Sequence, residues 1–133
     1  MNKVGANIGL DDLGRYFGDP YYGGSDKHSG GHNYLDTYEP LLEAYGPSAR
    51  LLEIGVNRGN SLATWGHWFP DGQVIGVDVT LEFFNRHFPR LQLLGANRHK
   101  NLYVLERELG VSHEKDEAFI DEAMQLTDGR PFD

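Results

Sequence analysis

The chain has 133 residues, of which 39% are hydrophobic and 24% charged, so its size and composition are those of one globular domain with one core. Its formal net charge of −8 argues against a general nucleic-acid partner and against an anionic membrane surface, because both are bound through basic faces. The absence of cysteine excludes disulfides, zinc–thiolate sites and thiol nucleophiles, and without an apolar membrane-spanning run or a signal-peptide segment we expect a cytoplasmic protein.

The N-terminal quarter of the chain, residues 1–33, is rich in glycine, aspartate and asparagine and has the composition of loops. We predict an irregular arm over 1–33 with one short helix over 10–17, followed by a folded unit over 34–133. The tyrosines and the phenylalanine of the arm indicate that parts of it pack against that unit.

The first helix of the folded unit is predicted to begin at Asp36, because Asp at the N-cap and Glu39 three residues later form a capping box. Pro40 is compatible with this helix in or near its first turn, and Gly46 followed by proline ends it. Large side chains recur along it at helical spacing, at Tyr38, Leu41, Leu42 and Tyr45.

A short apolar run over 50–56 that includes a glycine predicts a buried β-strand. Asn60 or Ser61 is the expected N-cap of the helix that follows. That helix carries Leu62 and a group of aromatic residues that we expect in the core, namely Trp65, Trp68 and Phe69.

A second strand, rich in β-branched residues, is predicted over 73–79, and Thr80 is the expected N-cap of a helix that Pro89 closes. A third strand is predicted over 102–105. The last predicted helix, over 115–126, has one apolar face made of Phe119, Ile120, Ala123 and Met124. Phe132 and Asp133 have the pattern of the first step of a further strand.

Helices and strands therefore alternate along the whole folded unit. This alternation predicts the α/β class, with a parallel sheet, right-handed crossovers and helices on its faces.

The segment 53–61 joins the first predicted strand to its helix and is the best candidate for a ligand site. Gly55 and Gly59 have no Cβ atom, so a ligand can approach the backbone closely, and the helix N-terminus directs N–H groups toward it. Asp78 ends the next strand, where an acid in a doubly wound sheet accepts hydrogen bonds from ribose hydroxyls. The pairing indicates a nucleoside-containing ligand; the alternative is an ordinary strand–helix turn with an unrelated acid.

The glycine spacing separates two classes of nucleoside ligand. Dinucleotide-binding loops have the pattern G-x-G-x-x-G, whereas here three residues separate Gly55 from Gly59, which disfavours a nicotinamide-binding domain. Glu53, two residues before the first glycine, is foreign to that pattern. The segment instead resembles the first motif of class I S-adenosylmethionine (SAM) methyltransferases, roughly (D/E)-x-G-x-G-x-G, with Asn57 in place of the middle glycine.

The resemblance extends over residues 25–80 and is to one branch of that superfamily. This branch contains the macrocin-type and mycinamicin-type sugar O-methyltransferases and the cephalosporin-hydroxylase-like proteins. The residues that carry the resemblance outside the glycine motif are Ser25, Asp26, Lys27, His32, Tyr34, Tyr38, Glu39, Ser61, Leu62, Trp65, Phe69, Pro70, Gly76, Val77 and Asp78.

The resemblance implies SAM as the cofactor and a Rossmann-like three-layer parallel sheet. It implies that the loop 55–59 wraps the methionine part of SAM, that Glu53 holds the turn near the amino group, and that Asp78 holds the ribose. Asn57 adopts a positive φ more readily than most residues, so it can replace the middle glycine. The other cofactor-binding candidates are Ser61, Tyr34 and Lys27, although Lys27 is equally compatible with a solvent-exposed ion pair.

In this family the next strand carries paired aspartates that bind Mg²⁺, with a histidine nearby as base. Here that strand is represented only by Phe132 and Asp133, so the magnesium ligands and the base have no counterpart. The resemblance therefore implies the N-terminal, cofactor-binding half of a class I methyltransferase fold. We expect this chain alone to bind SAM weakly and not to transfer its methyl group.

Two further readings of the sequence concern partners and metals. The alternative to a methyltransferase is a non-catalytic module, or gene fragment, that binds SAM or a protein partner. The open edge of such a sheet is prone to self-association. His28 and His32 have metal-binding spacing only in a helix, which the neighbouring glycines oppose, so no metal site is predicted.

Overall fold

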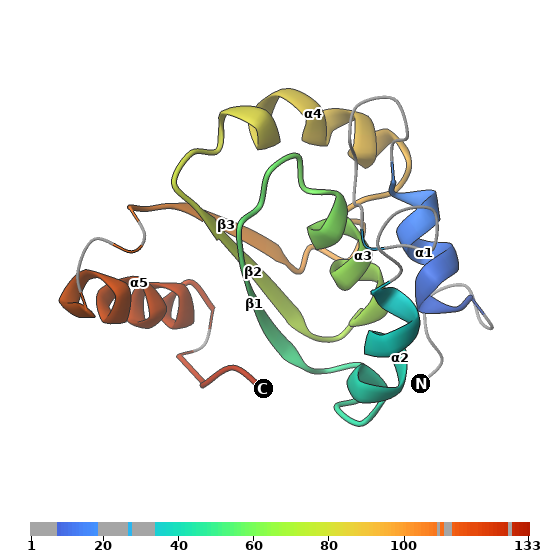
Figure 1. The fold of residues 1–133 in the computed structure, drawn as a ribbon, viewed down its shortest axis with the longest axis horizontal. Helices are drawn as coiled ribbons and strands as arrows, with labels where there is room; N and C mark the ends of the chain where they lie inside the picture. The colour runs from blue at the N-terminus through green and yellow to red at the C-terminus, as the bar shows by residue number, and fades with distance from the viewer. Residues whose placement is uncertain (1–7, 19–26, 28–33, 109, 111–112, 128) are drawn as a thin grey trace.

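The computed structural model describes residues 8–18, 27, 34–108, 110, 113–127 and 129–133. Two helices come first, and strands and helices then alternate (Figure 1). The helices are α1 (Leu10–Tyr16), α2 (Leu35–Glu43), α3 (Asn60–Trp68), α4 (Glu82–Leu93) and α5 (His113–Gln125). The strands are β1 (Arg50–Ile54), β2 (Gln73–Asp78) and β3 (Leu102–Glu106). The elements predicted from the sequence within these ranges are all present, with small differences in their bounds.

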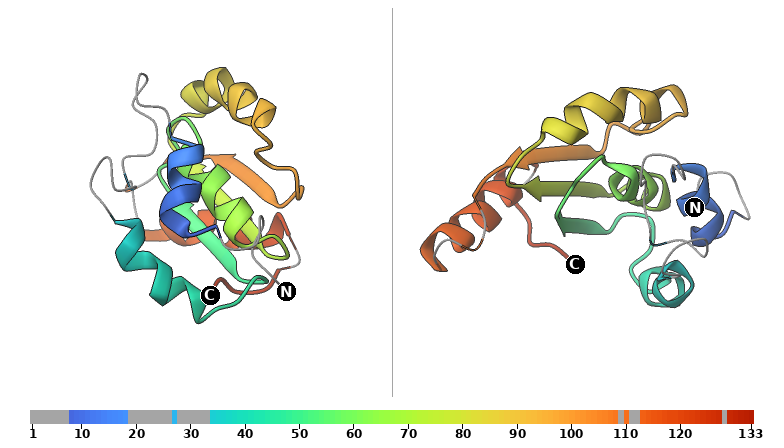
Figure 2. Two further views of the ribbon diagram at one scale, coloured as in Figure 1. Left: turned by 90° about the vertical axis from the view of Figure 1, so that its right-hand side faces the viewer. Right: turned by 45° about the horizontal axis from the view of Figure 1, so that its top comes forward.

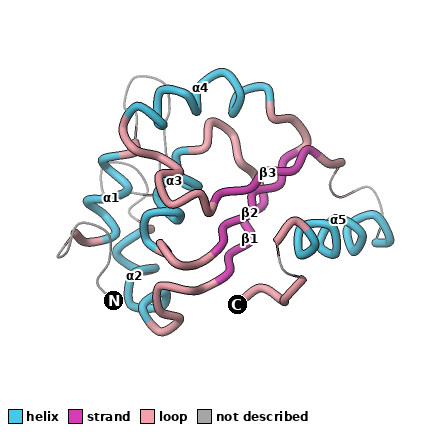
Figure 3. The backbone as a smooth tube through the Cα atoms, turned by 180° about the vertical axis from the view of Figure 1, so that it is seen from behind, coloured by secondary structure: helices cyan, strands magenta, loops and turns pink. Residues whose placement is uncertain are grey.

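The strands form one parallel sheet in the order β1–β2–β3 (Figure 3). In the register, Leu52 lies beside Ile75 and Gly76 lies beside Val104. This is the Rossmann-like α/β arrangement that the alternation predicted. The prediction of a buried first strand holds only in part: Arg50 is buried and the next three residues are half-buried, but Ile54 at the end of β1 is 61% exposed.

Alternate residues along the strands face two separate hydrophobic clusters. The larger cluster joins Val74 of β2 to buried side chains of the helices on one face, among them Leu10, Phe17, Leu62, Trp65, Phe88 and Leu91. The smaller cluster joins Ile75, Val77 and Leu105 to Phe119 and Ala123 of α5. The sheet is thus the middle of three layers, with α5 on the face opposite α3 and α4 (Figures 1 and 2).

Helix α5 leads the chain back from the last strand of the sheet toward the first. From β1 to β3 the chain moves one strand at a time in one direction, so right-handed crossovers put α3 and α4 on the same face. After β3, α5 carries the chain back along the other face. Asp133 then donates its backbone N–H to the carbonyl of Arg50 at 3.0 Å, on the free side of β1. The end of the described chain therefore lies beside the first residue of β1, on the side away from β2.

A buried arginine fixes this return. The backbone N–H of Arg50 donates to the carboxylate of Asp133 at 2.7 Å, and its guanidinium donates to Gln73 and Thr127. The guanidinium also lies over the ring of Phe132, 5.5 Å from its centroid. Phe132 and Asp133, which have the sequence pattern of the first step of a further strand, thus lie beside the first residue of β1 and are not themselves in a strand.

The start of α2 differs from the predicted capping box. The backbone N–H groups of Tyr34 and Leu35 both donate to the carbonyl of Lys27, so the helix begins before Asp36 and Pro40 lies beyond the first turn. Glu39 accepts a hydrogen bond from the backbone N–H of Leu10 at 3.1 Å. Its carboxylate therefore ties α1 to α2.

The predicted limits of two other helices are also wrong in part. Gly59, not Asn60 or Ser61, is the N-cap of α3, because the Asn60 side chain donates to the carbonyl of Phe17 instead. Pro89 lies inside α4 rather than at its end. Phe88 and Leu91 are buried on either side of it, and this burial offsets the hydrogen bond that proline cannot make.

Smaller differences concern α4 and α5. The N-cap of α4 is Leu81 rather than Thr80, although the Thr80 hydroxyl accepts the backbone N–H of Glu82. In α5, Phe119 and Ala123 are buried as predicted, whereas Ile120 is exposed.

A testable consequence of the close packing between α3 and β2 concerns Gly76. A Cβ atom on this residue would lie 2.7 Å from side-chain atoms of Leu62 and Val56. We expect Gly76→Ala to lower the free energy of unfolding by about 1–3 kcal/mol through overpacking. Urea unfolding followed by tryptophan fluorescence measures this. Gly9→Ala is the control, because a Cβ atom there meets its nearest neighbour at 3.6 Å; equal effects of the two variants would contradict the packing argument.

A second prediction concerns His67, which is buried between the rings of Phe17 and His99. Burial, followed by the charge of Arg98 and by His99, lowers the pKa of His67 to about 4. Between this value and the ordinary 6.5, the unfolded chain binds a proton that the folded chain does not. Above pH 6.5 the neutral His67 therefore makes its full contribution to the free energy of unfolding, and this contribution, up to about 3 kcal/mol, is lost as the pH falls to 4.

His67→Gln tests this directly. The free energies of unfolding of the wild type and of the variant are compared by urea titration at pH 7 and near pH 4.5. The wild type should lose more stability than the variant over this interval, and parallel losses would show that His67 does not titrate as described.

Candidate functional site

The loop 55–59 lies between β1 and α3 and has an unusual backbone. Gly55, Asn57 and Gly59 all have positive φ, at 92°, 50° and 91°. The expectation that Asn57 tolerates such a conformation is confirmed. A loop with alternating left-handed residues turns its N–H groups to one side, which is the arrangement that favours anionic or polar ligands.

The two glycines serve different purposes. A Cβ atom on Gly59 would lie within 3.0 Å of the rings of Phe84 and Phe88, so this glycine lets α4 pack against the start of α3. A Cβ atom on Gly55 would meet nothing within 4 Å among the described residues. The backbone at Gly55 is therefore open to an approaching molecule, at the carboxyl end of β1. In open α/β sheets, ligands bind outside the carboxyl ends of the strands.

Asp78 holds this loop in place. Its carboxylate accepts the backbone N–H groups of Val56 at 2.8 Å and Asn57 at 3.0 Å, and that of Val79 at 2.7 Å. Partial burial alone would raise the pKa of Asp78, but the N–H donors, including that of Thr80, outweigh it and hold the pKa below the ordinary value. The carboxylate thus connects the ends of β1 and β2.

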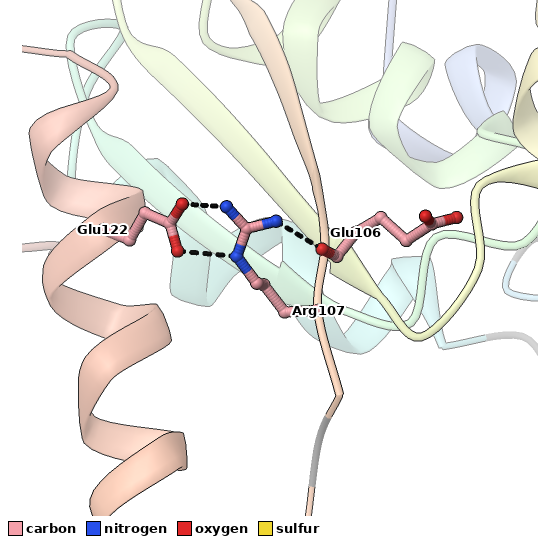
Figure 4. Close-up of polar contacts among 3 residues, drawn as sticks. All are labelled: Glu106, Arg107 and Glu122. Carbon is pink, nitrogen blue, oxygen red and sulfur yellow. Dashed lines mark hydrogen bonds and ion pairs between the residues drawn. The ribbon is translucent and has the colours of Figure 1, made fainter.

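The next strand repeats the arrangement. Glu106, the last residue of β3, accepts the backbone N–H of Leu81 at 2.8 Å, and so connects the end of β3 to the loop after β2. Arg107 beside it forms a bidentate ion pair with Glu122 of α5 and donates to the carbonyl of Glu106 (Figure 4). The hydrogen bond with Glu122 raises the pKa of Arg107, and that with Arg107 lowers the pKa of Glu122.

Glu53 is a half-buried acid in β1, two residues before Gly55. One carboxylate oxygen accepts the indole N–H of Trp65 at 2.7 Å, and the other is buried without a hydrogen-bond partner among the described residues. Burial raises the pKa of Glu53, and this effect is partly opposed by the Trp65 hydrogen bond and by the charge of Lys27. An isolated buried carboxylate oxygen is costly, so it indicates a site at which a donor or a cation completes the pairing.

A pocket of about 380 Å³ adjoins Glu53. It lies between α2, α3 and the free edge of β1, and its wall is mainly apolar and aromatic with one acid and one base. Its lining residues are Lys27, Tyr38, Leu42, Leu51, Leu52, Glu53, Ile54 and Trp65. The structure therefore brings Glu53 and Lys27, both predicted from the sequence, to the same cavity.

The remaining predicted site residues lie in different surroundings. Ser61 is buried in the first turn of α3. The side chain of Tyr34 is 45% exposed, and its ring lies 6.2 Å from that of Tyr38, centroid to centroid. Tyr38 lines the pocket and Tyr34 does not.

Sequence reasoning placed Trp65 in the core only. The residue is indeed buried, as are Trp68 and Phe69, but its indole N–H also binds the candidate acid. The signal that was available is the spacing: an indole one helical turn inside α3 faces back toward the strand that precedes the helix. Leu42 and Leu51 were likewise recognised only as apolar residues of a helix and a strand.

The described residues were also compared with the patterns of metal-ion sites and of membrane-spanning helices. In the described part of the chain, no three His, Asp or Glu side chains lie close enough to form a metal-ion site. His28 and His32 lie outside the described residues. None of the helices in the described ranges is long and apolar enough to cross a bilayer.

Comparison with known proteins does not identify a family. No family model matches the sequence, and no curated protein matches it. What the molecule shows is a small Rossmann-like α/β domain with a parallel three-stranded sheet and a glycine loop at the end of its first strand.

A testable prediction for this site concerns the contribution of the Asp78 carboxylate to stability. Asp78→Asn removes the charge that three backbone N–H groups bind, so we expect the free energy of unfolding to fall by about 1–3 kcal/mol at pH 7. Because the folded-state pKa is depressed, the wild type's advantage is present above the ordinary pKa of 3.8 and disappears as the pH falls through the lower, folded value.

Urea unfolding at neutral and acidic pH measures both effects. Glu82→Gln is the control, because Glu82 is an exposed acid paired only with Arg86 one helical turn away. A stability loss for Asp78→Asn no larger than that of the control would show that the carboxylate does not hold the loop.

Proposed function

We propose that this chain binds S-adenosyl-L-methionine at the loop 55–59, as the cofactor-binding half of a SAM-dependent O-methyltransferase of the sugar or natural-product type. One observation carries the proposal. The backbone of the loop is open above Gly55, at the carboxyl end of β1, and an acid lies on each side of it, Glu53 in β1 and Asp78 at the end of β2.

The donor set suits this cofactor. The N-terminus of α3 directs backbone N–H groups and the positive end of the helix dipole toward a carboxylate, whereas the N–H groups of Gly55, Val56 and Asn57 are bound within the protein. Glu53 has one oxygen without a hydrogen-bond partner among the described residues, which suits an ammonium group. Lys27 in the same pocket adds a positive charge for an anionic group. The pocket therefore has complementary charges for a zwitterionic amino-acid moiety and apolar walls for its chain.

The role of Asp78 is refined by its contacts. Its carboxylate already accepts backbone N–H groups from the loops after β1 and β2. A carboxylate has about four acceptor positions, and the N–H groups of the two loops, including that of Thr80, already use most of them, so ribose hydroxyls would have to share or replace some of these bonds. The main role of Asp78 is therefore to orient the loop, and a contact with the ribose would compete with that role.

In the proposed reaction the bound cofactor supplies a reactive sulfonium methyl group. The residues of this chain bind and orient it: the loop holds the backbone of the methionine part, Glu53 its amino group and Asp78 its ribose. No step is assigned to magnesium, because the described residues contain no cluster that would hold it.

The alternative is a non-catalytic module that binds SAM or a protein partner. It is favoured by one observation, the free edge of β1 beside the same pocket. The two candidates differ in whether the pocket binds the cofactor at all.

Calorimetric titration with S-adenosylhomocysteine tests the proposal. The variant is Gly55→Ala, which places a methyl group in the open space and strains a backbone with φ of 92°. We expect saturable binding by the wild type that the variant weakens about tenfold or more, which is about 1.4 kcal/mol.

Gly95→Ala is the matched control. Gly95 has φ of 96° and only one neighbouring atom, at 3.9 Å, but it lies after α4 at the opposite end of the sheet. Its substitution should cost similar backbone strain without changing affinity. No binding by the folded wild-type chain would overturn the proposal, and enhanced NADH fluorescence would favour a nicotinamide site instead.

A further inference from the structure

The indole of Trp65 holds one oxygen of the Glu53 carboxylate. Its N–H group donates to Oε2 at 2.7 Å, across the contact between α3 and β1. The ring is fixed by the core, because Trp65 is buried and belongs to the larger hydrophobic cluster. An indole N–H can only donate, so at this position it needs an acceptor, and Glu53 supplies one. Packing of the core therefore decides where the donor lies, and the donor orients the carboxylate.

The surroundings of this carboxylate contain few other polar groups. Its second oxygen, Oε1, is buried without a hydrogen-bond partner in the described part of the chain. In the sheet register Glu53 lies beside Gly76, which has no side chain. The other titratable residues that line the adjoining pocket are Lys27 and Tyr38. Among the described residues, Trp65 is thus the one that donates a hydrogen bond to Glu53.

The charge of Glu53 depends on this donor. Burial raises the pKa of Glu53, and the hydrogen bond from Trp65, followed by the charge of Lys27, acts in the opposite direction. A hydrogen bond to an ionised acceptor is stronger than one to a neutral acceptor, so the indole favours the carboxylate over the carboxylic acid. Asp78 differs, because several backbone N–H groups hold its pKa low. Glu53 is therefore the acid of the site whose charge a single side chain can change.

This charge decides which ligand group the pocket accepts. An ammonium group donates hydrogen bonds and accepts none, so it pairs with an ionised carboxylate and not with the hydroxyl of a carboxylic acid. The oxygen of Glu53 that Trp65 leaves without a donor is the one that would receive it. Where Glu53 is protonated in the free protein, the proton must leave for solvent before the ammonium group binds.

We propose that Trp65 is a positioning residue of the cofactor site, whose indole N–H keeps the Glu53 carboxylate ionised and leaves its second oxygen for the ammonium group of the ligand. The inference rests on the proposed function, because that function supplies the ligand. Affinity is then constant at high pH and falls by about tenfold for each pH unit below the pKa of Glu53, since a proton competes with the ammonium group. Loss of the indole donor moves this fall to higher pH.

The contact is tested without ligand by NMR of the ¹⁵N-labelled chain. Trp65 and Trp68 are its only tryptophans, so the spectrum contains two indole N–H signals, which Trp68→Phe assigns. Between about pH 5 and pH 8 the Trp65 signal should shift as Glu53 loses its proton, and Glu53→Gln should abolish the shift. Lysine and tyrosine side chains titrate near pH 10 in general, so Lys27 and Tyr38 do not account for such a shift. A Trp65 signal that is constant, or that still shifts in Glu53→Gln, overturns the proposal.

The second test is calorimetric titration with S-adenosylhomocysteine at several pH values. Trp65→Phe keeps most of the buried ring and removes the donor. We expect it to bind about tenfold more weakly than the wild type near pH 6 and to approach the wild type as the pH rises. Trp68→Phe is the matched control, because it makes the same change at a buried position of the same helix and should keep the wild-type profile. A loss of affinity by one factor at every pH is a packing effect and overturns the proposal.

The proposed function and this inference fail in different ways. If the folded wild-type chain binds no S-adenosylhomocysteine at any pH, the proposed function is overturned, and a Trp65 signal that titrates with Glu53 still supports the control of the acid by the indole. If the wild type binds and Trp65→Phe leaves the pH profile unchanged, only the inference is overturned. Circular dichroism of both phenylalanine variants verifies that they fold.

Discussion

The carboxylate of Asp78 is the interaction on which the candidate site depends. It binds backbone N–H groups from the loops after β1 and β2, so two strand ends that the sheet places side by side are joined by one side chain. Without it the loop 55–59 would lose the hydrogen bonds of Val56 and Asn57, which help to hold its three residues at positive φ. Glu106 repeats the connection one strand further, toward Leu81. At the carboxyl edge of the sheet, acidic side chains therefore bind backbone N–H groups of the neighbouring loops, and these bonds order the loops before any ligand is present.

The half-buried acid of β1, Glu53, differs from Asp78. One of its oxygens accepts the indole N–H of Trp65, and the other, which is buried, has no hydrogen-bond partner among the residues that the structure describes. Such a group costs stability, and proteins retain this cost mainly where a partner completes the pairing. The charge of this carboxylate suits a cationic ligand group, which is the role that the proposed cofactor site gives it.

Stability is distributed unevenly around this site. The sheet face of α3 and α4 has the larger cluster and the buried histidine His67, whereas α5 is attached by the smaller cluster and by the exposed pair of Arg107 and Glu122. Exposed ion pairs contribute little, because solvent and salt screen them. The attachment of α5 therefore relies on Phe119 and Ala123, and on the buried Arg50 that holds the segment after the helix.

The sequence by itself determined the order of elements, the parallel α/β class and the loop with its acids. These follow from local patterns: apolar runs bounded by glycine, helical spacing, and Asn57 at a position that needs positive φ. Tertiary contacts decided the rest. The carbonyl of Lys27 starts α2 before Asp36, and burial of Phe88 and Leu91 carries α4 past Pro89. The hydrogen bonds of Asp78, the surroundings of the Glu53 carboxylate and the edge position of β1 all depend on residues far apart in the chain. No local pattern encodes which distant partner a buried polar group meets.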